Sequence, residues 1–477
     1  MLWLSSAVAA GALVRYWHLT YASPHTDEAF TFALSSLPVP QLVAAVAATD
    51  FHPPLFYLVT HAMMMTFPKP QWEYRTITAL CGCLTVVATY GVSRRIFGPP
   101  AAGVAATAVA LFPALVQYDR IYRMYAVTVF LTTLSFWLLA EIEQADAARR
   151  RWLVVAYTLV VIALPYTDYL GALAVAVQAV YSVTRWRRLK VVAIAIGIAA
   201  LAFTPWLGPL REQLPLGGLV LSRPGLDIGL LATFQGAFAA GSPPSWSAWP
   251  GGELVPLLSV IALTAVGMRI GRATVMPWWL SLLWIQVLGS IALGKNLAYF
   301  PRYLLIDVPP LCVALGGLVG LLWSSRRQLI GAALGVAITS FLGVTLGNVL
   351  LDPYYQFPDW YALNAVMLPA EQPHDAVILD AGYERLAVQD LTAFRSREVL
   401  TFMNPGDFPA LLRWIEKHPE RRIWYVQHQH FYFDPQRRIA GALGARRRAL
   451  LAQTWPRRWP VDDVSVVLFD KVPMTIR

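Results

Sequence analysis

Two short polar segments interrupt the apolar amino-terminal part of the chain. Asp27 and Glu28 follow the first long apolar stretch, and Asp50 and His52 precede Pro53-Pro54, a pair that cannot continue a helix. Carboxylates beside hydrocarbon are costly, and membrane proteins seldom keep them there without a use. A positioned carboxylate can take the proton of a hydroxyl nucleophile, a role that Asp27 fits, and Glu28 is the second catalytic candidate, which would orient the acceptor or hold a metal ion. We predict that these residues form the floor of an active site at the outer face of a membrane.

Each of these residues also has a purely structural interpretation. Asp27 or Glu28 could cap a surface helix that starts near Ala29, because a helix dipole favours negative charge at its first turn. His52 could hydrogen-bond a turn beside Pro53, and Asp168 could only mark the end of a span. Glu28 and His52 are the candidate ligands of a divalent metal ion, whose requirement the residues leave open. The candidates for acceptor binding are His52, Tyr57, Asp50 and Asp168.

A second set of residues could bind an anion on the same side of the membrane. A phosphate leaving group gains negative charge as its bond breaks, and arginine or lysine can stabilise that charge. Guanidinium groups bind phosphate in a bidentate manner. Asp119 and Arg123 could instead pair on a helix end, and Arg302 could be an interfacial snorkelling residue. The candidates for phosphate binding are Arg302, Arg123, Arg120, Tyr303, Tyr125 and Lys295.

The composition is that of an integral membrane protein. Hydrophobic residues make up 57% of the 477 residues and charged residues only 14%. Soluble proteins have about 45–50% apolar and about 25% charged residues. Much of the net charge of +10 comes from arginines that are sorted between alternate loops, which is a signal of membrane topology. We therefore predict no nucleic-acid partner. The three cysteines lie in apolar segments and imply no disulfide framework.

Apolar stretches predict about eleven transmembrane helices, most near the roughly 20 residues that a bilayer requires. The first is favoured over a cleaved signal peptide because its start lacks a positive charge. Residues 24–71 are too interrupted to span, and we expect surface helices at 29–47 and 54–67. The predicted spans are 1–19, 74–93, 101–117, 124–141, 152–166, 169–184, 190–210, 253–268, 276–294, 304–323 and 328–350.

The basic residues sort between alternate loops. By the positive-inside rule the basic loops are cytoplasmic, which puts the amino terminus inside. An odd number of spans then puts the Asp27-Glu28 loop and the carboxyl terminus outside, as expected for a protein of a bacterial inner membrane. The basic loops carry Arg94-Arg95, Arg149-Arg150-Arg151, Arg185-Trp186-Arg187-Arg188, Arg269 with Arg272, and Arg326-Arg327.

The composition changes after a transmembrane domain of residues 1–351. Strand-like runs at 375–379, 397–402, 422–426 and 464–469 alternate with helical patterns at 383–391, 408–418 and 435–452. Residues 352–477 should therefore form a soluble α/β domain with a mainly parallel sheet. Three arginine-rich stretches near 437, 447 and 457 are interpreted as solvated or lipid-facing surface. The predicted fold is an α-helical polytopic membrane protein with a C-terminal soluble α/β domain.

The order of several motifs resembles the C-type glycosyltransferases of the protein O-mannosyltransferase and aminoarabinose transferase group. These motifs are the early Asp27-Glu28, then His52-Pro-Pro-Leu-Phe-Tyr57, Arg123-Met-Tyr125, Tyr299-Phe-Pro-Arg302-Tyr303-Leu-Leu305 before Pro309-Pro310, and Tyr354-Tyr-Gln-Phe-Pro-Asp-Trp360. The similarity covers the layout of most of residues 1–360, and the soluble domain only in type. Some members have an acidic residue where this chain has His52, which keeps the metal question open.

The resemblance implies a GT-C fold, a polyprenyl-phosphate-linked sugar donor and Asp27 as the base. It also implies an inverting transfer at the outer leaflet to a glycan, lipid or protein acceptor. A lipid-linked sugar flippase is the alternative. It would place ionisable groups near mid-membrane on broken helices within internal repeats, whereas here the ionisable residues cluster at one face and no repeat is evident.

The sorting of arginines gives a direct test of topology. Cysteines engineered near Ser23 and Gln436 should react with an impermeant thiol reagent added from outside, because both segments are predicted to be external. A cysteine near Arg187 should not react. Labelling at Arg187 in sealed, correctly oriented membranes would contradict this topology.

Overall fold

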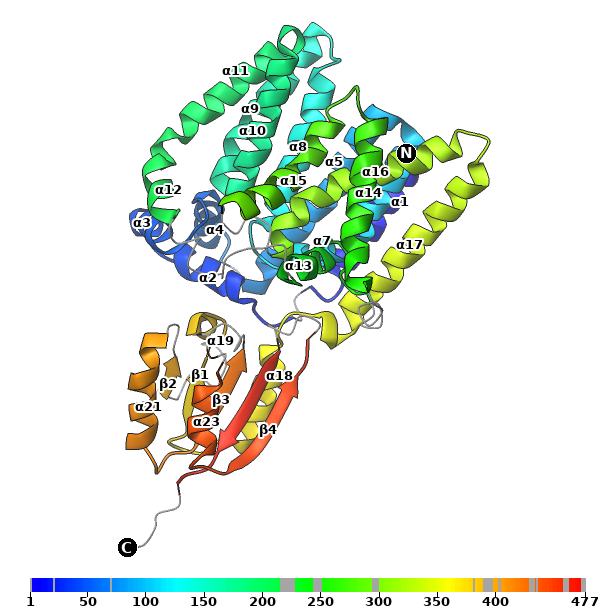
Figure 1. The fold of residues 1–477 in the computed structure, drawn as a ribbon. Coiled ribbons are helices and arrows are strands. Elements are labelled where there is room, and N and C mark those ends of the chain that lie inside the picture. The colour runs from blue at the N-terminus through cyan, green and yellow to red at the C-terminus, as the bar shows by residue number, and fades with distance from the viewer. Residues whose placement is uncertain are drawn as a thin grey trace, which may run out of the picture. The chain divides into compact units, whose positions relative to one another are not determined.

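The computed structural model describes residues 2–19, 22–68, 71–214, 228–242, 251–293, 300–380, 382–388, 398–401, 405–428, 434, 436–457 and 463–472. The chain divides into two compact units. The first comprises residues 1–20 and 34–348, and the second residues 21–33 and 349–477. The first unit is helical and the second is an α/β domain (Figure 1). Residues 21–33, which we expected in the transmembrane domain, group with the C-terminal unit.

Within the described residues, each predicted span overlaps one or more helices. Among the described residues, six helices are long and apolar enough to cross a membrane, or seven if the bent pair α6 and α7 is one span. The prediction of a polytopic helical fold is confirmed, but the number of eleven spans is not. With the shorter helices included, the described helices outside residues 24–71 in this part of the chain are α1 (Leu2–Tyr16), α5 (Arg75–Phe97), α6 (Pro99–Leu111), α7 (Pro113–Asp119), α8 (Tyr125–Ile142), α9 (Ala147–Thr167), α10 (Tyr169–Thr184), α11 (Trp186–Phe203), α12 (Leu207–Gln213), α13 (Ile228–Phe238), α14 (Val255–Ile270), α15 (Met276–Leu293), α16 (Val308–Trp323) and α17 (Gln328–Leu351).

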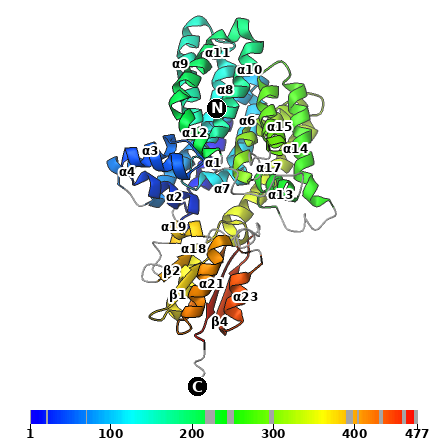
Figure 2. The ribbon, with the colours of Figure 1, turned by 60° about the vertical axis from the view of Figure 1, so that its left-hand side comes forward.

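Helices α9, α10 and α11 pack against one another and lie side by side in both views (Figures 1 and 2). Their shared end carries Asp168, which separates α9 from α10. Tight connections of this kind hold consecutive helices antiparallel, so residues at the loop ends keep fixed positions.

The segment predicted as one surface helix at 29–47 forms two helices, α2 (Thr26–Ser35) and α3 (Val39–Thr49). The break falls at Pro38, which has extended backbone angles and no N–H to continue a helix. The second surface helix, α4 (Leu55–Thr66), lies where it was expected and begins directly after Pro54.

A buried arginine stabilises the 55° bend between α6 and α7. Pro113 begins α7 and cannot donate a hydrogen bond to the carbonyl of Val109. The guanidinium of Arg15 from α1 donates instead to the carbonyls of Ala110 (2.8 Å) and Val109 (3.3 Å). Its Nε lies 2.8 Å from Oδ2 of Asp119, so the alternative pairing of Asp119 with Arg123 is wrong. Gly82 of α5 lies against this ion pair. A β-carbon at position 82 would occupy the space that the Asp119 carboxylate and the Arg15 guanidinium fill.

The second unit contains one mixed sheet with strand order β2-β1-β3-β5-β4. Strand β1 (Ala376–Leu379) pairs in parallel with β2 (Glu398–Thr401) and β3 (Ile423–His428), whereas β5 (Val464–Phe469) pairs antiparallel with β3 and with β4 (Ala449–Trp455). The expectation of a mainly parallel sheet is therefore only half correct.

The helix predicted at 435–452 is wrong in its second half. Helix α23 (Arg438–Gly444) ends at Gly444, and residues 449–455 form β4 instead. Pairing with β5 supplies the backbone hydrogen bonds of this strand, and such a non-local partner overrides the local helical pattern.

Helices cover both faces of the sheet (Figure 1). Alternate residues of β1 and β3 point to opposite faces, as the pleat requires. Val377 and Trp424 pack with α18 (Trp360–Met367) and α19 (Arg385–Val388). Ile378 and Tyr425 pack with α21 (Phe408–Lys417) and α23.

Two of the arginine-rich stretches contain a buried arginine. Arg447 is buried, and its guanidinium donates hydrogen bonds to the carbonyls of His418 (2.7 Å), Asp470 (3.1 Å) and Arg421. Arg457 is also buried. These two side chains correct the prediction of a purely exposed basic surface, since a fork of several donors can satisfy buried carbonyls.

The amino-terminal segment 22–33 is an integral part of the α/β unit. The Ser23 hydroxyl donates to the carbonyl of Pro358 (3.0 Å) and accepts from the amide of Trp360 (3.1 Å). The His25 and Phe357 rings lie edge to face, 4.6 Å apart. Ala29 packs into the apolar core with Trp360. The start of α2, which carries Asp27 and Glu28, is thus held by the C-terminal domain.

Candidate active site

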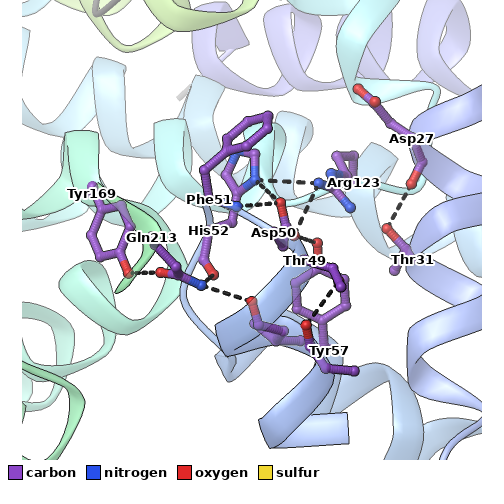
Figure 3. A network of polar contacts seen from close by, with 12 residues as sticks. Asp27, Thr31, Thr49, Asp50, Phe51, His52, Tyr57, Arg123, Tyr169 and Gln213 are labelled. Carbon is purple, nitrogen blue, oxygen red and sulfur yellow. Dashed lines mark hydrogen bonds and ion pairs between the residues drawn. The ribbon is translucent and has the colours of Figure 1, made fainter. Parts of the chain in front are cut away.

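Asp50, His52, Tyr57 and Arg123 form one buried polar network in the helical unit (Figure 3). Asp50 ends α3, and its Oδ1 accepts hydrogen bonds from the Phe51 amide (2.7 Å) and lies 2.9 Å from Nδ1 of His52. Its Oδ2 accepts from the Tyr57 hydroxyl and lies 3.5 Å from Nη2 of Arg123. The structure therefore brings together four residues that the sequence singled out separately.

The charge of Asp50 is stabilised despite its burial. Burial alone would raise the pKa of Asp50, but the neighbouring His52 and Arg123 and the hydrogen bonds from His52 and Tyr57 lower this pKa to about 2. The Arg123 guanidinium also lies over the Tyr57 ring, 5.4 Å from its centroid. A buried carboxylate with this many partners is held in one orientation.

Nδ1 of His52 lies between a group that can only accept and a group that can only donate. It is 2.9 Å from the Asp50 carboxylate and 3.3 Å from Nη2 of Arg123. A protonated Nδ1 donates to Asp50, whereas an unprotonated Nδ1 accepts from Arg123. The proton position on His52 thus decides which neighbour it orients.

Asp168 lies within electrostatic range of this network. It caps α10 by accepting a hydrogen bond from the Leu170 amide at 2.9 Å, which confirms its position at a helix end. Burial raises the pKa of Asp168, and the charges of His52 and Arg123 oppose that rise. The capping interpretation of Asp168 and its proximity to the acceptor-side candidates therefore both hold.

Sequence reasoning missed Gln213 and Tyr169. The Gln213 amide donates to the carbonyls of Val46 (2.8 Å) and His52 (3.2 Å), and its oxygen accepts from the Tyr169 hydroxyl (Figure 3). Gln213 thus joins the end of α12 to the His52 segment. A buried glutamine at the end of an apolar stretch was the available signal, because such an amide needs partners.

Arg302, Tyr303 and Tyr125 lie together, as predicted. The Arg302 guanidinium is 4.3 Å from the Phe300 ring centroid, 5.5 Å from Tyr303 and 5.9 Å from Tyr125. Aromatic faces attract a guanidinium within about 6 Å and hold its plane. A guanidinium held in this way has the planar fork of donors that suits a phosphate.

The other phosphate candidates differ in their surroundings. Arg120 donates from Nη2 to the carbonyls of Trp17 (2.7 Å) and His18 (3.4 Å), beyond the end of α1. Burial and the nearby Arg75 lower the pKa of Arg120 to about 10. The Arg120 guanidinium therefore binds the carbonyls beyond the end of α1, which makes Arg120 a weaker candidate for phosphate binding. Lys295 lies outside the described residues.

Asp27 and Glu28 occupy the first turn of α2 in the second unit. Glu28 accepts a hydrogen bond from the His25 amide at 2.9 Å, which is half of a capping box, so its capping interpretation is confirmed. The Asp27 amide donates to Nδ1 of His25 (3.1 Å), and Thr31 donates to the Asp27 carbonyl (2.8 Å; Figure 3). The Asp27 side chain is 23% exposed, and its Oδ2 lies 3.9 Å from Nδ1 of His25.

The described residues contain no group of three or more histidine, cysteine, aspartate or glutamate side chains placed to hold a metal ion. The residues seen here thus do not fit a preformed metal centre. The proposed metal roles of Glu28 and His52 stay predictions.

Comparison with known proteins defines the class of the fold. Residues 51–208 match the family described as dolichyl-phosphate-mannose-protein mannosyltransferase. ArnT from Cupriavidus metallidurans in the apo state has 14% identity and a TM-score of 0.54 over 98% of this chain and 97% of that chain. The same protein bound to undecaprenyl phosphate gives 14% identity and 0.52 over 98% of each chain. The apo Archaeoglobus fulgidus oligosaccharyltransferase gives 11% and 0.53 over 90% and 69%.

No curated protein sequence matches the chain. The family match contains His52, Tyr57, Arg123 and Asp168, and the structural likeness extends over nearly the whole chain. The chain therefore has the fold of the C-type membrane glycosyltransferases, and the resemblance inferred from its motifs is confirmed.

The lowered pKa of Asp50 predicts how stability depends on pH. An aspartate in an unfolded chain has a pKa of about 3.9, so the stabilisation by ionised Asp50 is complete above that value and is lost as the pH falls toward 2. Asp50→Asn should lower the thermal midpoint at pH 7 and weaken its fall between about pH 4 and about pH 2. Thermal unfolding of both proteins in detergent measures this. Equal pH dependence in the two would contradict the prediction.

Proposed function

We propose that this protein is a membrane glycosyltransferase that moves a sugar from a polyprenyl-phosphate donor to an acceptor at the outer membrane face. The observation that carries the proposal is the family match over 51–208, which contains the buried His52 and Arg123 network. Additional support comes from ArnT, a structural neighbour crystallised with undecaprenyl phosphate.

The proposed reaction is a single displacement that inverts the anomeric carbon. Asp27 accepts the proton of the acceptor hydroxyl, and the acceptor oxygen forms a bond to the anomeric carbon. The bond from that carbon to the phosphate oxygen breaks, and its electron pair leaves on the lipid phosphate. Arg302, held by aromatic rings, stabilises the charge that develops on this phosphate. No step of the proposal passes through a metal ion.

The roles of the remaining residues follow from their contacts. Arg123 holds Asp50 ionised, and Asp50 in turn orients His52 and Tyr57. We assign His52 and Asp168 to the acceptor side and Tyr125 and Tyr303 to the donor side. The acceptor is a glycan, a lipid or a protein, and the transferred sugar a hexose or a pentose. We place the protein in a bacterial inner membrane with its amino terminus inside and residues 352–477 outside.

The purified protein, mixed with a panel of polyprenyl-phosphate sugars and candidate acceptors, should release free lipid phosphate. Stoichiometric appearance of the glycosylated acceptor supports the transferase. Movement of an intact donor across proteoliposomes without release of lipid phosphate supports the flippase alternative instead.

Asp27→Asn tests the base. The amide keeps the shape of the side chain but cannot accept the proton, so turnover should fall by about 10²–10⁴-fold while folding and donor binding persist. Initial rates and donor affinity for the variant and the wild type provide the measurement. Asp352→Asn, which changes an exposed carboxylate of the same unit, is the control and should retain activity. Near-normal turnover by Asp27→Asn would remove it as the base.

Arg302→Lys and Arg302→Ala separate phosphate binding from snorkelling. If the planar fork binds the donor phosphate, lysine should be partly defective and alanine severely so, with little change in stability. A snorkelling arginine would tolerate lysine fully, and alanine would act mainly through stability. Donor affinity, turnover and thermal midpoints distinguish these outcomes, with the exposed Arg269→Ala of α14 as control.

A further inference from the structure

A buried cluster of titratable side chains lies at the carboxyl ends of two parallel strands in the α/β unit. Asp380 follows β1 directly, and His428 is the last residue of β3. Glu384 lies four residues after Asp380, before α19. All three are buried. The strand order β2-β1-β3 makes this a point where connections diverge to opposite sides, the usual location of a bound ligand in such sheets.

In this protein the amino-terminal segment contacts that cluster. Nδ1 of His428 lies 3.0 Å from Oε1 of Glu384, and the Thr26 hydroxyl donates a hydrogen bond to Oε2 of the same carboxylate. The His428 amide donates to Oδ1 of Asp380 at 2.6 Å, and the Trp360 ring meets the His428 ring edge to face at 5.5 Å. Glu384 therefore has one oxygen on His428 and one on Thr26.

Thr26 is the first residue of α2 and immediately precedes Asp27. A hydrogen bond at this position restrains the backbone of the turn from which the Asp27 carboxylate projects. The contacts of Ser23 and Ala29 hold the segment on either side, and Thr26 makes its contact from the position directly before Asp27. Side chains that hold a reacting group through a second layer of hydrogen bonds commonly fix its orientation.

A different ion pair joins the same two strands at their other end. At the amino ends of the same strands, Asp375 forms a bidentate ion pair with Arg422 (2.9 and 2.7 Å), which joins β1 to β3 directly. Glu384 and His428 instead join the sheet to a segment about 360 residues earlier in the chain. Burying a carboxylate costs free energy unless it is paired. The buried Glu384 carboxylate at the contact with Thr26 is therefore a candidate for a functional role.

We propose that Glu384 and His428 are positioning residues for the catalytic base. His428 orients Glu384, Glu384 holds Thr26, and Thr26 fixes the first turn of α2 so that the Asp27 carboxylate keeps one orientation. This inference depends on the proposed function, in which Asp27 is the base. It assigns to the C-terminal domain a part in catalysis.

The test uses the full-length protein and three variants of the contact. Thr26→Val keeps the shape and removes the hydroxyl, Thr26→Ser restores it, and Glu384→Gln removes the charge. A displacement of about 1 Å at a reacting group can cost about 10²-fold in rate. We expect Thr26→Val and Glu384→Gln to lower kcat by about 10–100-fold with little change in the KM for the donor, and Thr26→Ser to recover most of the rate.

Asp375→Asn is the matched control, because it breaks a buried pair at the other end of the same strands. It should lower the thermal midpoint of the domain and leave kcat per folded molecule near the wild-type value. If Asp375→Asn lowers kcat as much as Thr26→Val, the effect is merely structural and the proposal fails. The Thr26 pair keeps the test decisive if Glu384→Gln does not fold, since Thr26 is only partly buried.

Failure of this proposal and failure of the proposed function give different results. Wild-type kcat in Thr26→Val and Glu384→Gln, together with an inactive Asp27→Asn, would overturn the positioning role alone. An active Asp27→Asn would overturn the base and this inference with it. Hydrogen exchange of the amides at 26–33 gives a readout besides activity. Faster exchange in Glu384→Gln than in Asp375→Asn supports the contact, and equal rates contradict it.

Discussion

The burial of carboxylates in an apolar helical unit is the constraint on which the rest of this structure depends. A charge removed from water must be matched by an opposite charge and by hydrogen bonds. Asp119 is matched by Arg15 and Asp50 by Arg123, in each case from a distant part of the sequence. Removing one partner of such a pair leaves a buried charge that costs several kcal/mol, about 3–5 in measured cases. These pairs therefore fix where the polar loops lie.

The two ion pairs are connected through one bent segment. Arg15 donates to the carbonyls of Ala110 and Val109 at the bend before Pro113 and binds Asp119 at the other end of α7. The bend sets the direction of α7, and the chain then turns through Arg120 to Arg123 before α8 begins. An arginine that stabilises a proline bend thus places a second arginine beside Asp50. The same few buried charges therefore stabilise the fold and form part of the candidate site.

The α/β unit differs from the helical unit in where its buried charges lie. Its core is apolar, and its buried polar groups lie at the strand ends. Asp375 with Arg422 at the amino ends joins neighbouring strands, whereas Glu384 with His428 at the carboxyl ends contacts Thr26. The helix that carries Asp27 begins within this domain rather than within the helical unit. The segment that carries Asp27 is therefore held by residues that follow it by more than 300 positions in the chain.

The sequence by itself determined the polytopic helical class, the location of the apolar helices and the change to an α/β unit near residue 352, because apolar length and charged interruptions are local properties. It also determined that Glu28 could cap α2. Only the tertiary structure decided that Arg123 pairs with Asp50 rather than with Asp119, that residues 449–455 form a strand, and that residues 21–33 join the C-terminal unit. The physical reason is the same in each case. A buried charge, an unpaired strand edge and a short segment such as 21–33 are each stabilised by partners that lie far away in the chain. A local sequence pattern does not indicate which residues those partners are.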